Sequence, residues 1–296
     1  MLVRNPERLR ELEGIEVTRG DLQDRTSLDR AVAGCEVVYH IAADYRLWTK
    51  QPEEMFRTNV EGTRGLLEAA RNAGVERVVY TSTVGCIHVP PGGVGDEGSP
   101  VSLQEMAGPY KQSKFLAERV ALEFASRGLP VVIVNPTAPV GDHDFRPTPT
   151  GKIVLDFMRG AMPAFLDTGL NVVDVRDVAE GHLMACERGR VGERYILGAE
   201  NLTLEQIFLK LAEITGRPAP KLRIPYVVAW VVGVISTAFA EITGHEPRAP
   251  LDGVRMARKK MWVNHSKAAQ ELGYSPGPAA EALRRATEWF RANAYC

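Results

Sequence analysis

The sequence predicts an α/β fold built on a doubly wound parallel sheet, followed by a smaller and mostly helical C-terminal lobe. Two observations lead to this prediction. Short apolar segments alternate with helix-like segments over the first 140 residues, and the pattern returns at residues 172–178 before the chain becomes mostly helical from residue 203. Apolar strands separated by helices are typical of a parallel sheet with both faces covered.

Each element follows from its local pattern. Strands are expected at residues 2–3, 15–18, 37–43, 78–83 and 131–136, and a strand that passes into a helix at 172–178. Further helices are expected at 7–13, 26–33, 53–73, from 110 onward, and 281–293. The polar residues of interest lie mostly where these strands end. Because ligands bind outside the carboxyl ends of the strands in such sheets, the sequence predicts a cofactor cleft at this edge.

Composition excludes several kinds of function. The chain has 296 residues and a formal net charge of -1, so it lacks the basic excess that binding to nucleic acid requires. The histidines show no metal-ligand spacing and the four cysteines lie far apart, which predicts no metal and a reduced, cytoplasmic compartment.

One segment raises a membrane question. Residues 226–240 are nearly all apolar and are flanked by Lys221, Arg223 and Glu241. The run is shorter than the about 20 residues that a spanning helix needs. A buried or lid helix and a membrane-surface contact both remain open, and a true span is disfavoured.

Tyr110 and Lys114 are the strongest catalytic candidates. Pro109 suits a first helical turn, and residues four apart share a face of a helix. An ammonium beside a phenol favours phenolate and lowers its pKa, which allows proton transfer to an alcohol or ketone oxygen. The spacing alone is common enough to arise by chance, and its bland interpretation is a partly buried tyrosine beside a solvated lysine.

Further motifs stand around this pair in a fixed order. They are Gly20-Asp21-Leu22, His40-Ile41-Ala42-Ala43, Asn59-Val60-Glu61-Gly62-Thr63, Thr81-Ser82-Thr83, Asn135-Pro136-Thr137, Asp174-Val175-Arg176-Asp177-Val178-Ala179 and Leu272-Gly273-Tyr274-Ser275-Pro276. With them the whole chain resembles the extended short-chain dehydrogenase/reductase family, also called the NAD-dependent epimerase/dehydratase family, whose fold is of the Rossmann type. Residues 141–151 and 195–198 resemble most closely its hopanoid-associated sugar epimerases and dihydroflavonol reductase-like proteins.

The resemblance implies three catalytic roles. Tyr110 is the general acid/base, Lys114 lowers its pKa and holds the nicotinamide ribose, and Thr83 hydrogen-bonds the reacting oxygen. By itself Thr83 is an ordinary strand residue. Asn59 is expected to fix the helix near the active site through backbone hydrogen bonds.

The resemblance also implies a dinucleotide site along the strand ends. Asp21 accepts from the adenine amino group, or alternatively caps the next helix, and Leu22 packs on the ring. Arg4 lies at the adenosine ribose, where an arginine suits a 2'-phosphate, so NADP is preferred with NAD as the alternative. The other expected cofactor contacts are Ala42, Ala43, Ser82, Tyr110, Lys114, Pro136 and Thr137.

The chain departs from this family at its start. The first strand, its glycine-rich turn and the first helix, about 30 residues in all, have no counterpart before Arg4. Residues 93–98 match Gly-x-Gly-x-x-Gly formally, but they open no helix and carry two acids, so they are rejected. We expect a sheet that is open at its centre and weak cofactor binding by these residues alone.

The predicted domains are residues 1–140 with 172–198 for the cofactor, and residues 141–171 with 199–296 for the substrate. The expected function is hydride transfer at a secondary alcohol or ketone by an epimerase or a ketone reductase, and the alternative is a non-catalytic scaffold. Loop 142–151, with His143, Arg146 and Lys152 near it, either meets the substrate or is solvated. The substrate is a sugar, a nucleotide sugar or an aromatic or lipid ketone, and a homodimer is left open.

Overall fold

The central element is a sheet of four parallel strands. The computed structural model describes residues 1–6 and 14–296, so the helix expected at 7–13 lies outside the described residues. Within that part the sheet has the order β3-β4-β5-β9. Its strands are β3 (Val37–His40), β4 (Arg77–Thr81), β5 (Val131–Pro136) and β9 (Arg194–Leu197).

A second, separate pair of strands lies at the N-terminus. β1 (Leu2–Val3) pairs in parallel with β2 (Thr18–Arg19), and neither is hydrogen-bonded to β3 in the described residues. Val37 and Tyr39 on the free edge of β3 are more than one-third exposed. The expectation of a sheet open at its centre is therefore confirmed.

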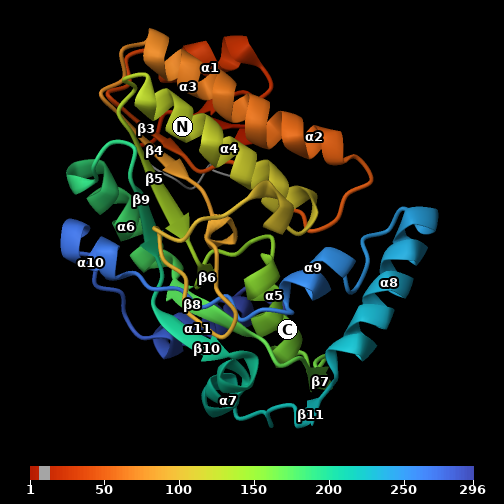
Figure 1. Ribbon diagram of the computed structural model, residues 1–296. Coiled ribbons are helices and arrows are strands. Elements are labelled where there is room, and N and C mark those ends of the chain that lie inside the picture. The colour runs from red at the N-terminus through yellow and green to blue at the C-terminus, as the bar shows by residue number, and fades with distance from the viewer. Residues whose placement is uncertain (7–13) are drawn as a thin grey trace.

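Helices cover both faces of the main sheet, which makes the fold doubly wound. Because side chains alternate along a strand, Val78 and Ile133 face one layer and Val79 and Val134 face the other. Figure 1 shows the helices of the first layer stacked above the sheet. That layer holds α3 (Gly62–Asn72) and α4 (Gly108–Ser126), with α1 (Arg25–Val32) packed on α3, and the opposite layer holds α6 (Val175–Arg188) and α10 (Ser266–Leu272).

The helix expected at 53–73 is interrupted rather than continuous. It consists of α2 (Pro52–Phe56), a π-helical turn, η2 (Arg57–Glu61), and then α3. Asn59 lies in the π turn and is buried. A π-helical insertion rotates the side chains that follow it, and such turns are frequent at functional sites.

The C-terminal part forms the smaller lobe around its own core. Buried side chains of three helices and of a three-stranded sheet meet there, among them Phe157, Phe208 and Phe290. The sheet has the order β10-β8-β6. The elements are β6 (Ala138–Val140), α5 (Pro149–Met158), β7 (Ala164–Phe165), β8 (Gly169–Asp174), β10 (Glu200–Thr203), α7 (Leu204–Thr215), β11 (Leu222–Arg223), α8 (Tyr226–Thr243), α9 (Leu251–Met256) and α11 (Ala279–Ala292).

Candidate active site

Tyr110 lies in the first turn of α4, beyond the carboxyl end of β4. Pro109 starts the helix, and Gly108 precedes it with φ of 77°. A side chain at Gly108 would collide with the Asp252 carboxylate, so this position requires glycine for both its conformation and its space. The start of the catalytic helix is thus fixed against α9 of the smaller lobe.

Thr83 lies two residues after the end of β4 and reaches the same site. Its Oγ1 accepts from the Gly85 N-H at 3.1 Å, and its carbonyl accepts from Asn135 Nδ2 at 3.0 Å. Burial raises the pKa of Tyr110 to about 12, and a side-chain hydrogen bond with Thr83 opposes that rise. Tyr110 and Thr83 are therefore neighbours, as the motif order predicted.

Lys114 is held by groups other than Tyr110. Its Nζ donates to the Tyr80 hydroxyl at 3.1 Å and to the Thr81 carbonyl at 2.8 Å, and it lies 4.8 Å from the centre of the Tyr80 ring. The pKa of Tyr110 is raised rather than lowered. The main cause of this rise is that the phenol is buried away from water.

The charge on Lys114 is held in an apolar interior. The residue is 3% exposed, and burial lowers its pKa to about 8. Burial and the Lys114 charge together lower the pKa of His40 to about 3, so this histidine is neutral at physiological pH. Tyr80 and His40 had no role assigned from the sequence. Tyr80 lies inside an apolar strand run, where it is indistinguishable from a packing residue.

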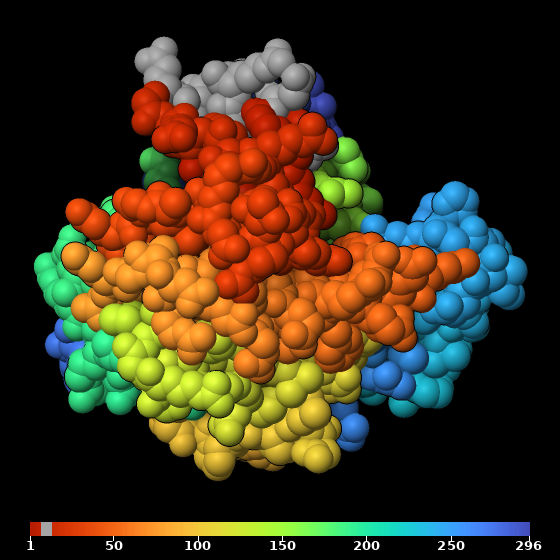
Figure 2. Space-filling view, turned by 90° about the horizontal axis from the view of Figure 1, so that it is seen from above, coloured from red at the N-terminus to blue at the C-terminus, as the bar shows by residue number. Residues whose placement is uncertain are grey.

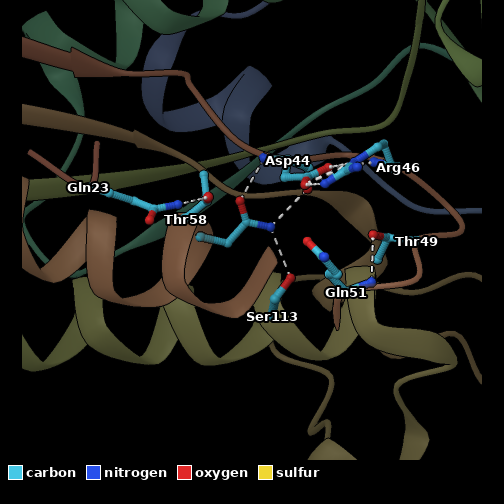
Figure 3. A network of polar contacts seen from close by, with 8 residues as sticks. Gln23, Asp44, Arg46, Thr49, Gln51, Thr58 and Ser113 are labelled. Carbon is cyan, nitrogen blue, oxygen red and sulfur yellow. Dashed lines mark hydrogen bonds and ion pairs between the residues drawn. The ribbon is translucent and has the colours of Figure 1, made fainter. Parts of the chain in front are cut away.

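Asn59 braces the catalytic helix. Its Nδ2 donates to Ser113 Oγ and to the Asp44 carbonyl, both at 2.9 Å, and its Oδ1 accepts from the Asp44 N-H at 2.7 Å. Ser113 Oγ in turn donates to the Tyr110 carbonyl at 2.9 Å. Figure 3 shows Asp44 and Ser113 linked through this network. Ser113 was missed because its partner lies 54 residues away and no local pattern marks the pair.

Two predicted cofactor residues carry unsatisfied hydroxyls. Ser82 Oγ and Thr137 Oγ1 are buried, and in the described part of the chain they have no hydrogen-bond partner beyond the weakly polar thiol of Cys86 beside Ser82. They follow β4 and β5, which are neighbours in the sheet. Since buried polar groups are normally paired, these hydroxyls fit a bound polar molecule at the strand ends. Pro136 ends β5 beside Thr137 and is buried.

The remaining cofactor candidates lie at the ends of β1, β2 and β3. Arg4 is exposed. Burial raises the pKa of Asp44, but hydrogen bonds from Arg46 lower it more, and the charge of Arg4 also lowers it, so the pKa lies below its usual value. Asp21 is half-buried and accepts from the Gln23 N-H at 2.9 Å.

Two small residues and Leu22 complete the set of cofactor candidates. Ala42 is exposed and Ala43 is half-buried, directly after β3. Leu22 packs beside the cluster of Leu28 and Leu66, and a Cβ at Gly62 would lie 2.9 Å from the Leu22 Cβ. Its side chain thus belongs partly to the core between α1 and α3.

Loop 142–151 folds against the smaller lobe. Asp142 forms an ion pair with Arg176, and Asp144 accepts from the Thr148 N-H at 2.9 Å. His143 is mostly exposed and contacts the ring of Trp289 on α11 at 6.4 Å. The loop is therefore anchored by its own acids, and the histidine faces solvent.

A cavity opens beside the start of the catalytic helix. It has a volume of about 290 Å³ and lies between loop 46–49, α2, α8 and α9. Pro109, which precedes Tyr110, is part of its wall, together with Trp48 and Thr237. The cavity thus borders the residue that directly precedes the predicted acid/base. In the residues that the structure describes, no cluster of three potential metal ligands is found.

Comparison with known proteins agrees with this geometry. Residues 3–198 match the model of the NAD dependent epimerase/dehydratase family. A putative dihydroflavonol 4-reductase from Synechocystis is 44% identical, over 98% of this chain and 85% of that protein. Sterol demethylase protein B from Methylococcus capsulatus is 37% identical, over 95% and 87%. The solved structure of a nucleoside-diphosphate-sugar epimerase from Pseudomonas aeruginosa superimposes with a TM-score of 0.79 at 29% identity, covering 98% of this chain and 87% of that one.

Proposed function

Since the chain belongs to the NAD dependent epimerase/dehydratase family, we propose that it reduces a ketone, or epimerises a secondary alcohol, with Tyr110 as the general acid/base. The observation that supports this most is the arrangement of Tyr110 and Thr83 at the end of β4, above a buried lysine. A tyrosine, a hydroxyl and a cation at one strand end provide proton transfer and orientation together.

The protonated state of Tyr110 fits the role of acid in a reduction. With its pKa raised to about 12 by burial, the phenol is protonated at neutral pH and enters the reaction as an acid. It gives its proton to the oxygen of a carbonyl that Thr83 Oγ1 orients. Lys114, held by the Tyr80 hydroxyl and the Thr81 carbonyl, supplies a positive charge at the end of the same strand, β4.

The cofactor that fits is a nicotinamide dinucleotide, which supplies a hydride when bound. Ser82 and Thr137 offer unpaired buried hydroxyls to it, and Ala42 and Ala43 allow its close approach. We propose NADP(H) over NAD(H), because Arg4 presents an exposed guanidinium at the end of β1, and a guanidinium suits a 2'-phosphate. Binding of NAD(H) at least as tight as that of NADP(H) would contradict this preference.

The substrate proposed is an apolar ring ketone. Two relatives support this class by name, the putative dihydroflavonol 4-reductase and sterol demethylase protein B. The cavity beside Pro109 is walled in part by Trp48, Met55 and Leu251, which suit an apolar body. A nucleotide sugar is the second candidate, favoured by the likeness to the sugar epimerase structure.

The experiment is a comparison of Tyr110→Phe with the parent protein. NADPH absorbance is followed with flavonoid and sterol ketones and with nucleotide sugars. We expect the variant to lose about 10²–10⁴-fold in kcat while its affinity for NADPH is unchanged. Tyr295→Phe, which removes a phenol that bonds the Phe145 carbonyl far from the site, is the control. Retention of turnover by Tyr110→Phe, or absence of turnover in the parent with every ketone and sugar, would favour a scaffold.

We also propose that the chain is divided into a cofactor-binding part and a substrate-binding part, with the bounds expected from the sequence. Residues 1–140 and 172–198 hold the cofactor, and residues 141–171 and 199–296 hold the substrate in a cytoplasmic protein. α10 is an exception in packing, because Ala268 and Leu272 lie in the core of the cofactor half. Whether the protein associates with a membrane or with a second copy of itself depends on how α8 contacts its surroundings.

A further inference from the structure

α8 carries its bulky apolar residues on the outside. Val231, Ile235 and Phe239 are 44%, 65% and 65% exposed, and Ile242 reaches 84%. These positions recur every three to four residues, so they share one face of the helix. An ordinary surface helix has the opposite arrangement, with the large apolar residues turned to the core.

The small residues of α8 face the protein instead. Ala229, Gly233 and Ala240 are its buried positions. A Cβ at Gly233 would lie 3.1 Å from the Val254 side chain, so the helix packs closely on α9. Thr237 Oγ1 on the same side accepts from the Leu251 N-H at 3.0 Å.

α8 is therefore held to the body while its apolar face is turned away from it. Figures 1 and 2 show it at the margin of the molecule, where it projects beside α9. Among the described residues it is the one helix long and apolar enough to cross a membrane. Its hydrogen bonds and close packing with α9 keep it on the protein surface, and this arrangement suits a helix that lies in an interface rather than one that spans it.

The charge of the segment that contains α8 indicates which kind of surface the helix binds. Residues 217–260 contain eight lysines and arginines against three carboxylates, whereas the whole chain has a net charge of -1. Arg258 lies over the Tyr226 ring at 5.9 Å, at the N-terminal end of the helix. Trp230 is 43% exposed one turn further along. Exposed apolar residues with aromatic and cationic neighbours are the features of a helix bound to anionic lipid.

A second copy of the chain is a poorer occupant. A twofold interface over α8 would place this surface against itself, so the cationic segments would face one another. Such like-charge contact is unfavourable across an interface. We propose that α8 is a membrane-docking helix that lies in the headgroup layer of an anionic bilayer, with its apolar face in the lipid.

The position of α8 gives this docking a consequence for the site. Thr237 and Glu241 belong to the wall of the cavity that also contains Pro109. A lipid surface at α8 therefore lies next to the opening towards the catalytic helix. This consequence rests on the proposed function, whereas the docking itself does not.

The test is flotation of the purified chain with vesicles. We expect binding to phosphatidylcholine vesicles that contain phosphatidylglycerol, weaker binding to phosphatidylcholine alone, and loss of binding as salt rises, because the cations are screened. The triple variant Val231→Ser, Ile235→Ser and Phe239→Ser should bind at least about tenfold more weakly. Leu209→Ser, which changes a residue that is 51% exposed on α7, is the matched control and should bind like the parent.

Three further readouts keep the test decisive. Circular dichroism and the melting temperature show that the triple variant is folded, and turnover with a water-soluble ketone is expected to be unchanged in it. If the parent fails to float with anionic vesicles, or the triple variant floats equally well, the docking proposal is refuted. It is also refuted if sedimentation shows a parent dimer that the triple variant dissociates. Failure of the Tyr110→Phe test alone would leave vesicle binding unaffected.

Discussion

Replacing Asn59 by leucine should weaken the brace that holds the catalytic helix. Asn59 is 2% exposed and makes three hydrogen bonds, two to the Asp44 backbone and one to Ser113 Oγ. Leucine has a similar size but can make none of them, so three polar groups lose a partner. At about 1 kcal/mol for each hydrogen bond, the free energy of unfolding should fall by about 3 kcal/mol.

Urea unfolding followed by circular dichroism measures this change, and the melting temperature should fall by about 6 °C or more. The control is Thr58→Ala, which removes one exposed hydrogen bond to Gln23 in the same π turn and should cost less than about 0.5 kcal/mol. Because Ser113 also bonds the Tyr110 carbonyl, kcat should fall in Asn59→Leu beyond what the Thr58 variant shows. If Asn59→Leu unfolds within about 0.5 kcal/mol of the parent, the brace does not stabilise the site and the reasoning is wrong.

Three other predictions follow from single residues. Lys114 has its pKa lowered to about 8, so between pH 8 and 10 the unfolded chain binds more protons than the folded chain. The free energy of unfolding should therefore rise with pH in this range. Urea titrations of Lys114→Met should show a smaller rise of that free energy with pH. Arg4→Ala should weaken NADPH binding by about tenfold and leave NADH binding unchanged, as measured by fluorescence titration, and an equal loss for both would contradict a 2'-phosphate contact. Gly108→Ala should lower the free energy of unfolding by more than the about 1 kcal/mol expected for Gly74→Ala. Both glycines have a positive φ, but only at Gly108 would a side chain also collide with Asp252. Equal losses in the two variants would show that the Asp252 contact is unimportant.

The order of elements could be predicted from the sequence because it depends on local patterns. The apolar run at 131–136 is β5, and the apolar run from 226 is α8, both close to their expected bounds. Strand alternation and helical periodicity are properties of neighbouring residues, so they are visible without contacts. The placement of Thr83 beside Tyr110 follows in the same way, since parallel strands bring their carboxyl ends to one edge.

Contacts between distant segments could not be predicted in this way. The π turn at Asn59 interrupts a helix that its sequence favours throughout, and it exists where Asn59 meets Asp44 and Ser113. Likewise, the direction of the Tyr110 pKa depends on burial, which a four-residue spacing does not contain.

The sequence by itself determined the fold class, the order of the strands and helices, and the residue types available at the strand ends, because these depend on local periodicity. Only the tertiary structure decided that Lys114 donates a hydrogen bond to Tyr80. It also decided that α8 turns its large side chains outward. Both outcomes depend on which surfaces meet, and that is a property of the packed chain.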